Sequence, residues 1–358
     1  MENKSDRKIL FMQIIGIILV VIGHSGPIDR SKWQFTFDFI YSFHMPLFFF
    51  ISGILFYTSV VEKNRFELTY LIKNKAVKLL IPYFIITLIA FIPKIMLSKL
   101  AARPIEGLSL QTVVNALFIP ANNPIVFFWF LPVIFFIFIY FQILLRFYKK
   151  LDKNRATLII VIISTAIFII TRVYKVDIKF LEIGKTFYYQ WYFMLGIVFS
   201  VYRNKGISPL SCGHFPFTRG NVCKSPLLKR GRFRGGFCFI IVTISLITLI
   251  LLNLYYRNLI LTSLIGIIFI TSASYIPKME ELTKYSVLKN IGKYSYQIYL
   301  LSWFPQVFYR IIFYDKNMGQ IPLVISMILS TAISLIVPVI IAVSVQKINK
   351  KWLKNIIG

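Results

Sequence analysis

Long apolar runs constrain this chain more than any other feature. Each run is about 17 to 25 residues long, and a helix of that length crosses the hydrocarbon core of a bilayer. Every backbone N–H and C=O must be hydrogen-bonded within the protein there, and a helix pairs these groups within one segment. The sequence therefore predicts one all-α domain over residues 1–358, a polytopic transmembrane helical bundle of about ten helices. The expected spans are 9–25, 37–57, 79–98, 125–146, 156–173, 186–202, 237–254, 258–277, 294–314 and 322–346.

The charged residues support this class and orient the chain. Hydrophobic residues make up 57% of the sequence and charged residues 15%, whereas soluble domains carry about 25% charged residues. The net charge is +28, but 29 of the 41 Lys and Arg residues fall in the ends and loops that share one side. Positive residues mark cytoplasmic loops, so we expect both termini to be cytoplasmic. No RNA-binding motif accompanies the charge, and nucleic acid is not expected as a partner.

Two segments between the expected spans are unusual. Residues 99–124 are interpreted as an outer loop with a re-entrant or amphipathic piece. Residues 204–236 form an atypical basic, Gly- and Pro-rich stretch that is expected to be a cytoplasmic loop and could be an insertion. The three cysteines and one histidine lie in or beside it, at Cys212, His214, Cys223 and Cys238. Their spacing does not match paired zinc ligands, so we expect no metal site, and a flexible loop is the simpler interpretation.

His24 ends the first apolar run, in "VVIGHSGPIDR" (20–30), where an ionisable side chain is costly. Gln13 lies eleven residues earlier in the same run. Eleven residues are three helical turns plus about 20°, so the two side chains share one face and are about 16 Å apart along the axis. They would mark two depths of one polar path through the membrane.

His44 lies in the second run, "SFHMPLFFFISG" (42–53), which is expected to travel inward. It should therefore meet His24 in the outer part of the membrane. Pro46 follows and frees a backbone carbonyl, as prolines often do where a membrane helix lines a cavity. Ser52 lies one to two turns deeper.

Two membrane histidines suggest acid–base or acyl-transfer chemistry. A neutral imidazole can take a proton from a hydroxyl near pH 7, or accept an acyl group itself. The structural alternative is a histidine that only hydrogen-bonds between helices.

Six stretches resemble the acyltransferase-3 family of integral membrane acyltransferases, and especially its branch of sugar O-acetylases related to fucose 4-O-acetylase. They are "IIGIILVVIGHS" (14–25), "YSFHMPLFFFISG" (41–53), "KNKAVKLLIPYF" (73–84), "FFWFLPVIFF" (127–136), "YYQWYFMLGIVFS" (188–200) and "IGKYSYQIYLLSW" (291–303). They occur in the family's order over most of the chain, and "FHMPLFFFISG" is the most specific.

The resemblance implies a cytoplasmic acyl-CoA donor, acetyl-CoA, and a sugar acceptor. It matches His24 to the family's essential histidine and His44 to its second-helix histidine. Lys75 and Lys78 match a basic pair suited to the phosphates of coenzyme A, or they are ordinary cytoplasmic charge. Trp129 would stack on a sugar or on the pantetheine arm, or anchor the helix at the membrane interface.

Two positions depart from the family pattern. A basic residue is common where this chain has Gln13, and a histidine is common where it has Ser302. Glutamine donates hydrogen bonds but cannot neutralise an anionic donor. The expectation includes an inactive family member for this reason.

We therefore expect a membrane O-acyltransferase that moves an acetyl group to a sugar hydroxyl of a cell-surface polysaccharide or its lipid-linked precursor. Its catalytic residues would be His24 and His44, with Gln13, Ser52, Lys75, Lys78 and Trp129 in binding roles. It would lie in the cytoplasmic membrane of a bacterial cell, in contact with lipids. A transporter or flippase of lipid-linked glycans is the alternative, although the internal repeats typical of transporters are not evident.

Overall fold

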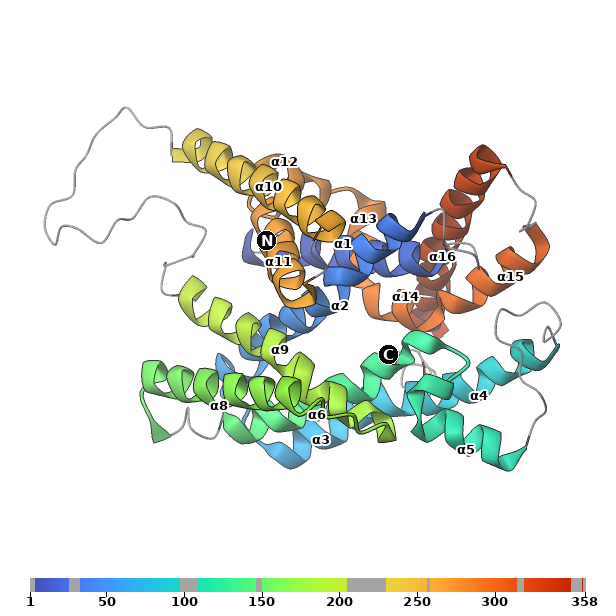
Figure 1. Ribbon diagram of the computed structural model, residues 1–358, viewed down its shortest axis with the longest axis horizontal. Helices are drawn as coiled ribbons and strands as arrows, with labels where there is room; N and C mark the ends of the chain where they lie inside the picture. The colour runs from blue at the N-terminus through green and yellow to red at the C-terminus, as the bar shows by residue number, and fades with distance from the viewer. Residues whose placement is uncertain are drawn as a thin grey trace, which may run out of the picture.

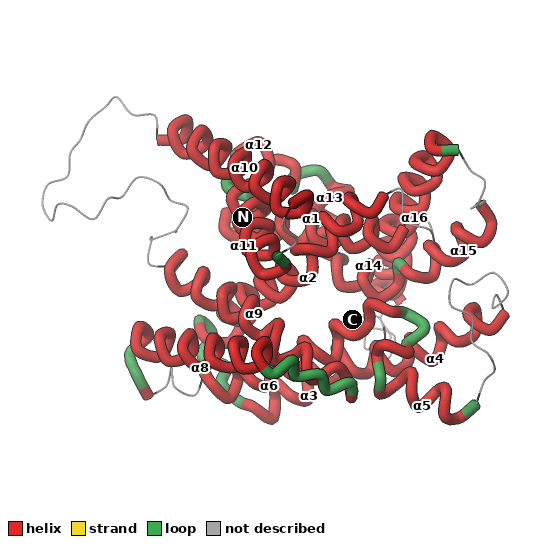
Figure 2. The backbone as a smooth tube through the Cα atoms, in the orientation of Figure 1, coloured by secondary structure: helices red, strands yellow, loops and turns green. Residues whose placement is uncertain are grey.

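The computed structural model describes residues 4–25, 33–96, 109–145, 150–204, 230–255, 258–313 and 319–348, together with Ile356. Regular structure in these ranges is entirely helical, without strands (Figure 2). The all-α prediction is confirmed.

The described helices are of two sizes. The long ones are α1 (Lys4–Ser25), α2 (Gln34–Phe56), α4 (Ile81–Met96), α6 (Phe130–Leu144), α8 (Lys153–Val173), α9 (Ile183–Asn204), α10 (Arg230–Tyr255), α11 (Leu259–Ala273), α15 (Trp303–Phe313) and α16 (Gln320–Ile348). The short ones are η2 (Tyr57–Val61), α3 (Leu68–Lys75), η3 (Ala76–Leu80), α5 (Leu110–Phe118), η5 (Pro120–Asn122), η6 (Val126–Trp129), η7 (Phe180–Glu182), α12 (Pro277–Leu282), α13 (Ser286–Lys293) and α14 (Ser295–Leu301).

Seven helical stretches in the described residues are long and apolar enough to cross a membrane. They are Arg7–Ser25, Gln34–Val61, Leu68–Met96, Val126–Leu144, Lys153–Val173, Cys238–Tyr255 and Ile321–Ile348. Each overlaps an expected span, which supports the polytopic membrane bundle. The third is longer than expected because the π-helical turn η3 joins α3 to α4, and the second because the π-helical turn η2 extends α2 at its C-terminal end.

Three expected spans differ from this simple form. α9 is long enough but carries a row of Tyr, Trp and Gln, and it is not among the seven apolar stretches. α11 is a shorter apolar helix. The expected span 294–314 is divided at Ser302 into α14 and α15.

Pro305 explains the division of that span. Proline has no N–H, so it cannot donate to the carbonyl of Leu301 four residues earlier. It sits in the first turn of α15, where an N–H needs no helical partner. The backbone N–H of Gln306 still donates to Ser302 O at 3.3 Å, so the chain bends at Ser302 and continues.

The expected outer segment 99–124 contains one amphipathic helix, α5, within its described part, which begins at residue 109. Ser109 caps α5 by accepting a hydrogen bond from Thr112 N at 3.1 Å. Asn123 then organises the turn into η6, since its side chain donates to Thr87 Oγ1 at 2.7 Å and accepts from Ile125 N at 2.8 Å. These contacts seat α5, η5 and η6 on α4.

The expected loop 204–236 is only partly within the described residues. Residues 205–229 lie outside them, including Cys212, His214 and Cys223. Residues 230–236 were expected to be loop, but they form the first two turns of α10. Cys238 is buried in that helix, with 4% of its surface exposed.

α2 and α9 lie at the centre of the molecule. In Figure 1, α1 and α10 to α16 lie on one side of them and α3 to α8 on the other. α2 packs most extensively on α9 and then on α11 and α1, while α9 also packs on α8 and α6. The two helices therefore join the halves of the bundle.

Two glycines let α2 and α9 approach to backbone contact. A methyl group added at Gly53 would meet Phe193 O at 2.1 Å, and one added at Gly196 would meet Phe50 O at 2.0 Å. Small residues at such crossings are the usual means of tight helix packing in membranes. No side chain fits at either position without separating the helices.

Pro46 lies inside α2 without breaking it. It cannot donate to Ser42 O, which would leave a buried carbonyl unpaired. Ser263 of α11 takes that role, since its Oγ donates to Ser42 O at 2.7 Å. The carbonyl that the proline frees is therefore satisfied by a neighbouring helix.

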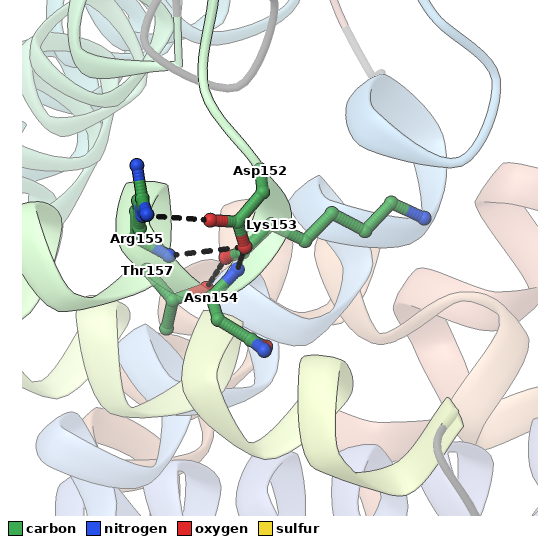
Figure 3. Close-up of polar contacts among 5 residues, drawn as sticks. All are labelled: Asp152, Lys153, Asn154, Arg155 and Thr157. Atoms are coloured by element: carbon green, nitrogen blue, oxygen red, sulfur yellow. Dashed lines mark hydrogen bonds and ion pairs between the residues drawn. The ribbon is translucent and has the colours of Figure 1, made fainter.

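α8 begins with a side-chain cap. Asp152 Oδ1 accepts from the backbone N–H of Asn154 at 2.8 Å and of Arg155 at 3.4 Å (Figure 3). These are two of the amides that a helix start leaves without intrahelical partners. The ion pair of Asp152 with Arg155 is exposed, so it contributes little.

The first and last long helices meet at α13. Gly292 faces Leu10 of α1 with no room for a methyl group, and the hydroxyl of Tyr294 donates to Gln346 of α16 at 3.0 Å. The early part of α1 and the end of α16 are thus both in contact with α13 or its C-cap residue.

Candidate active site

His24 lies in the last turn of α1 and is half-buried. Its Nδ1 is 2.8 Å from Val20 O. A carbonyl only accepts, so Nδ1 carries the proton and the neutral ring has its lone pair on Nε2. Its ring also meets Phe127 edge-on, with centroids 4.5 Å apart. The imidazole is therefore fixed in both tautomer and orientation.

His44 repeats this arrangement ten residues into α2. Its Nδ1 is 2.8 Å from Ile40 O, which again assigns the lone pair to Nε2. Only 2% of its surface is exposed, however. The two rings share a chemistry, but His24 is the more accessible.

Tyr41 connects the two histidines. Its ring lies edge-on to both imidazoles, with centroids 5.9 Å from His24 and 5.1 Å from His44. Its hydroxyl donates to Gly23 O at 2.8 Å. The predicted pairing of the two histidines across α1 and α2 is thus present, with an aromatic ring between them.

α15 holds the end of α1 with two polar side chains that the sequence analysis did not identify. Gln306 Nε2 donates to Val21 O and to Ser25 Oγ, both at 3.1 Å. Arg310 donates from Nη2 to the backbone oxygen of His24 at 2.8 Å. The last four carbonyls of a helix, His24 O among them, have no partners within it, and Arg310 supplies one. Gln306 adds to the bond that Val21 O already accepts from Ser25 Oγ at 2.7 Å, so both donors fix the turn that carries His24. Their signal is a polar pair four residues apart in an otherwise apolar helix.

η6 forms a second wall beside His24. Phe127 presents its ring to the imidazole, and its backbone oxygen accepts a hydrogen bond from the hydroxyl of Tyr299 in α14. The hydroxyl of Tyr296, one turn earlier, donates to Lys78 O in η3. Three residues span about 4.5 Å along a helix, so one turn of α14 connects the segment of the basic pair to the wall of the histidine site.

The basic pair divides between two environments. Lys75 is half-buried, with Nζ 3.9 Å from the centroid of the Phe138 ring in α6. Lys78 is exposed. Only Lys78 presents its ammonium outward.

Gln13 and Ser52 are both half-buried, on α1 and α2. Gln13 lies three turns from His24, so it is not part of the imidazole's immediate surroundings. Ser302, where the resemblance led us to expect a histidine, is 1% exposed and lies between α14 and α15.

Trp129 lies in an internal aromatic cluster. Its ring centroid is 5.2 Å from that of Tyr189 and 6.4 Å from that of Phe49. Lys185 Nζ lies 4.5 Å from the ring centroid. The half-buried ring therefore packs against α9.

This arrangement suits the abstraction of a proton by His24 from a substrate bound next to η6. His24 provides a fixed, half-exposed base, and its helix end is held by α15. The rings of Tyr41 and Phe127 cover part of the imidazole and lower the polarity beside it, which strengthens polar interactions with a bound substrate.

Comparison with known protein families matches residues 7–343 to the acyltransferase-3 family, described as an acyltransferase domain. The matched range covers nearly the whole chain. No curated protein and no solved structure matches the chain. The family match agrees with the resemblance carried by the histidine motifs. The chain is therefore a member of the acyltransferase-3 family of membrane acyltransferases.

Proposed function

We propose that this acyltransferase moves an acetyl group from acetyl-CoA to a hydroxyl of a cell-surface polysaccharide or its lipid-linked precursor. The observation that carries the proposal is the imidazole of His24, held by Val20 O with Nε2 as its basic atom. A hydroxyl acceptor needs such a base, and a half-exposed ring can reach one.

The proposed reaction is a direct transfer of the acetyl group, with His24 carrying the proton. His24 Nε2 takes the proton of the sugar hydroxyl as that oxygen attacks the thioester carbonyl. The new C–O bond forms, the C–S bond breaks, and the proton passes from the imidazole to the departing thiolate. The products are the acetylated sugar and coenzyme A, and His24 returns to its neutral form.

His44 acts as a positioning residue in this proposal. It is buried, and it contacts the site through Tyr41, whose ring lies against both imidazoles. Its role is to fix Tyr41 and thereby the face of His24.

The donor would enter from the side of the basic pair, which we assign to the cytoplasm of a bacterial cell. Lys78 is exposed and suits a phosphate of coenzyme A, while Lys75 is held on Phe138. Tyr296 and Tyr299 support this route, because they join the segment of Lys78 to η6. Both termini would lie on the same side.

The test uses membranes from cells that express the chain, supplied with radiolabelled acetyl-CoA. Wild type should incorporate label into glycan, and His24→Ala should lose nearly all of it. His214→Ala, which changes the third histidine, is the matched control and should behave as wild type. Equal incorporation by wild type and His24→Ala would remove His24 as the base, and glycan export without any acetyl transfer would favour a transporter.

A further inference from the structure

The chain enters α9 through a strained turn. Leu181 and Glu182 both have left-handed backbones, with φ of 47° and 54°. Such angles are uncommon outside glycine, and two in succession need support from the surroundings. Gly184 follows, where an added methyl group would meet Ile178 N at 2.7 Å. The turn is therefore tightly packed.

The strain places a carboxylate inside the protein. Glu182 is 6% exposed, and its Oε1 lies 3.4 Å from Lys185 Nζ. The Lys185 side chain itself is 41% exposed. A buried carboxylate costs free energy even when it is paired. The fold thus maintains both a strained turn and a buried charge at one point.

Thr186 adds an unused hydroxyl one turn further along α9. It is 5% exposed, and its Oγ1 has no hydrogen-bond partner within the described part of the chain. Most buried polar groups are paired, and an exception calls for an explanation. A ligand that hydrogen-bonds here would provide one.

Aromatic rings complete this cluster. Lys185 Nζ lies over Trp129, and Tyr189 lies 5.2 Å from Trp129 between centroids. Phe49 stacks on Tyr189 at 4.6 Å. The cluster therefore combines a carboxylate, an ammonium, an unpaired hydroxyl and aromatic rings.

The cluster and His24 share η6 as a neighbour. Phe127 contacts His24, and Trp129 contacts Tyr189 and Lys185. A 3₁₀-helix has three residues per turn, so positions 127 and 129 point about 120° apart. A ligand held at Trp129 and the imidazole would therefore lie against adjacent faces of η6.

We propose that Glu182, Thr186 and Trp129 form an acceptor subsite for the sugar unit next to the one that is acylated. This subsite rests on the proposed function. A carboxylate only accepts hydrogen bonds, so the ligand must present donors such as hydroxyls. An aromatic face attracts the positively polarised C–H face of a ring. Lys185 already balances the charge of Glu182, which favours a neutral polyhydroxyl ring over a charged one.

Two variants distinguish binding from folding. Thr186→Val keeps the shape of the side chain and removes a buried hydroxyl that makes no hydrogen bond in the described part of the chain, so it should not lower stability. A loss of acceptor binding in this variant would then not come from unfolding. Glu182→Gln keeps the shape and removes the charge. Glu281→Gln is the matched control. Glu281 also pairs with a lysine three residues later, Lys284, but both side chains of that pair are exposed, and the two charged groups are 3.8 Å apart.

The experiment uses the full chain in lipid nanodiscs with radiolabelled acetyl-CoA. Glycan lipid extracted from membranes that the wild type acetylates serves as acceptor at increasing concentrations. We expect Thr186→Val and Glu182→Gln to raise the acceptor KM at least tenfold, with the KM for acetyl-CoA unchanged and Glu281→Gln equal to wild type. Thermal unfolding is measured in parallel, and Thr186→Val should unfold no earlier than wild type.

Each contrary result points to a different error. Normal acceptor kinetics in Thr186→Val and Glu182→Gln, with His24→Ala inactive, would overturn the subsite and leave the proposed function standing. An equal fall in all rates together with early unfolding would make the cluster structural. No incorporation by wild type would overturn the proposed function and the acceptor subsite with it.

Discussion

Pro46 in α2 and Pro305 in α15 remove the same hydrogen bond with opposite results. α2 continues because Ser263 of α11 donates to the freed carbonyl of Ser42 at 2.7 Å. At Pro305 the helix divides, and α15 starts at Trp303. The comparison teaches that a proline's effect on a membrane helix depends on what the neighbouring helix supplies.

The two prolines also serve the two histidines differently. The intact α2 carries His44 within the bundle. α15, which follows the division at Ser302, carries Gln306 and Arg310 to the last turn of α1, where they hold the carbonyls of Val21 and His24. One histidine is supported by its own helix and the other by a neighbour.

The largest expected effect separates the two histidines. His24→Ala should lower kcat by about 100- to 10,000-fold, the range for loss of a general base. The fold-loss in kcat for His44→Ala should be at least ten times smaller than that for His24→Ala, because His44 acts through Tyr41. Acetyl incorporation measured on both variants at equal folded protein checks this order, and equal losses would make His44 a second catalytic group.

Ser263→Ala should break the support of α2. A buried acceptor left unpaired costs about 1–3 kcal/mol, and the low end applies because Ser263 Oγ also contacts Leu259 O. Thermal unfolding in detergent gives the measurement. Adding Pro46→Ala supplies an N–H for Ser42 O, so the double variant should recover most of the loss. A double variant no more stable than Ser263→Ala would contradict the account of Pro46.

Arg310→Gln should loosen the support of His24. The shorter side chain cannot reach the backbone oxygen of His24, and a hydrogen bond from a charged group contributes about 1.5 kcal/mol or more. We expect kcat to fall by roughly tenfold, with the KM for acetyl-CoA unchanged. Arg155→Gln, at an exposed arginine, is the control. A change in the KM alone would instead place Arg310 at the donor.

Pro305→Ala should have the smallest effect. The new N–H can reach Leu301 O, so the bend at Ser302 relaxes and Gln306 moves relative to Val21. Activity should fall less than in Arg310→Gln, while thermal stability stays equal or rises, since proline is the poorer helix residue. Activity below that of Arg310→Gln would mean that the bend itself positions more than these two donors.

The positions of most helices could be predicted from sequence, because apolar length and loop charge are local properties. The division at Ser302 could not be predicted, because a proline within an apolar run has either outcome in this chain: α2 continues through Pro46, whereas the helix divides next to Pro305. The shared neighbourhood of His24 and His44 followed from their places on successive spans of opposite direction. Tyr41 between them depends on side-chain packing, which periodicity does not encode.

The remaining site residues left weaker signals. Gln306 and Arg310 are visible as a polar pair in an apolar helix, but their targets are backbone carbonyls of a helix 280 or more residues away in sequence. Glu182 is one of only 13 acidic residues, yet its burial arises from a left-handed turn that no local pattern predicts. Lys75 and Lys78 read as one pair in sequence and face different surroundings in the fold.

The contact of α2 with α9 at Gly53 and Gly196 has a mechanical consequence. Backbone atoms that touch directly leave no side-chain layer to slide or repack, so the two helices must move as one piece. His44 lies in α2 and Glu182 directly precedes α9. The distance between His44 and Glu182 should therefore stay constant throughout turnover. Any opening that admits or releases a substrate then has to occur at another helix–helix contact, one that is formed by side chains rather than by backbone atoms.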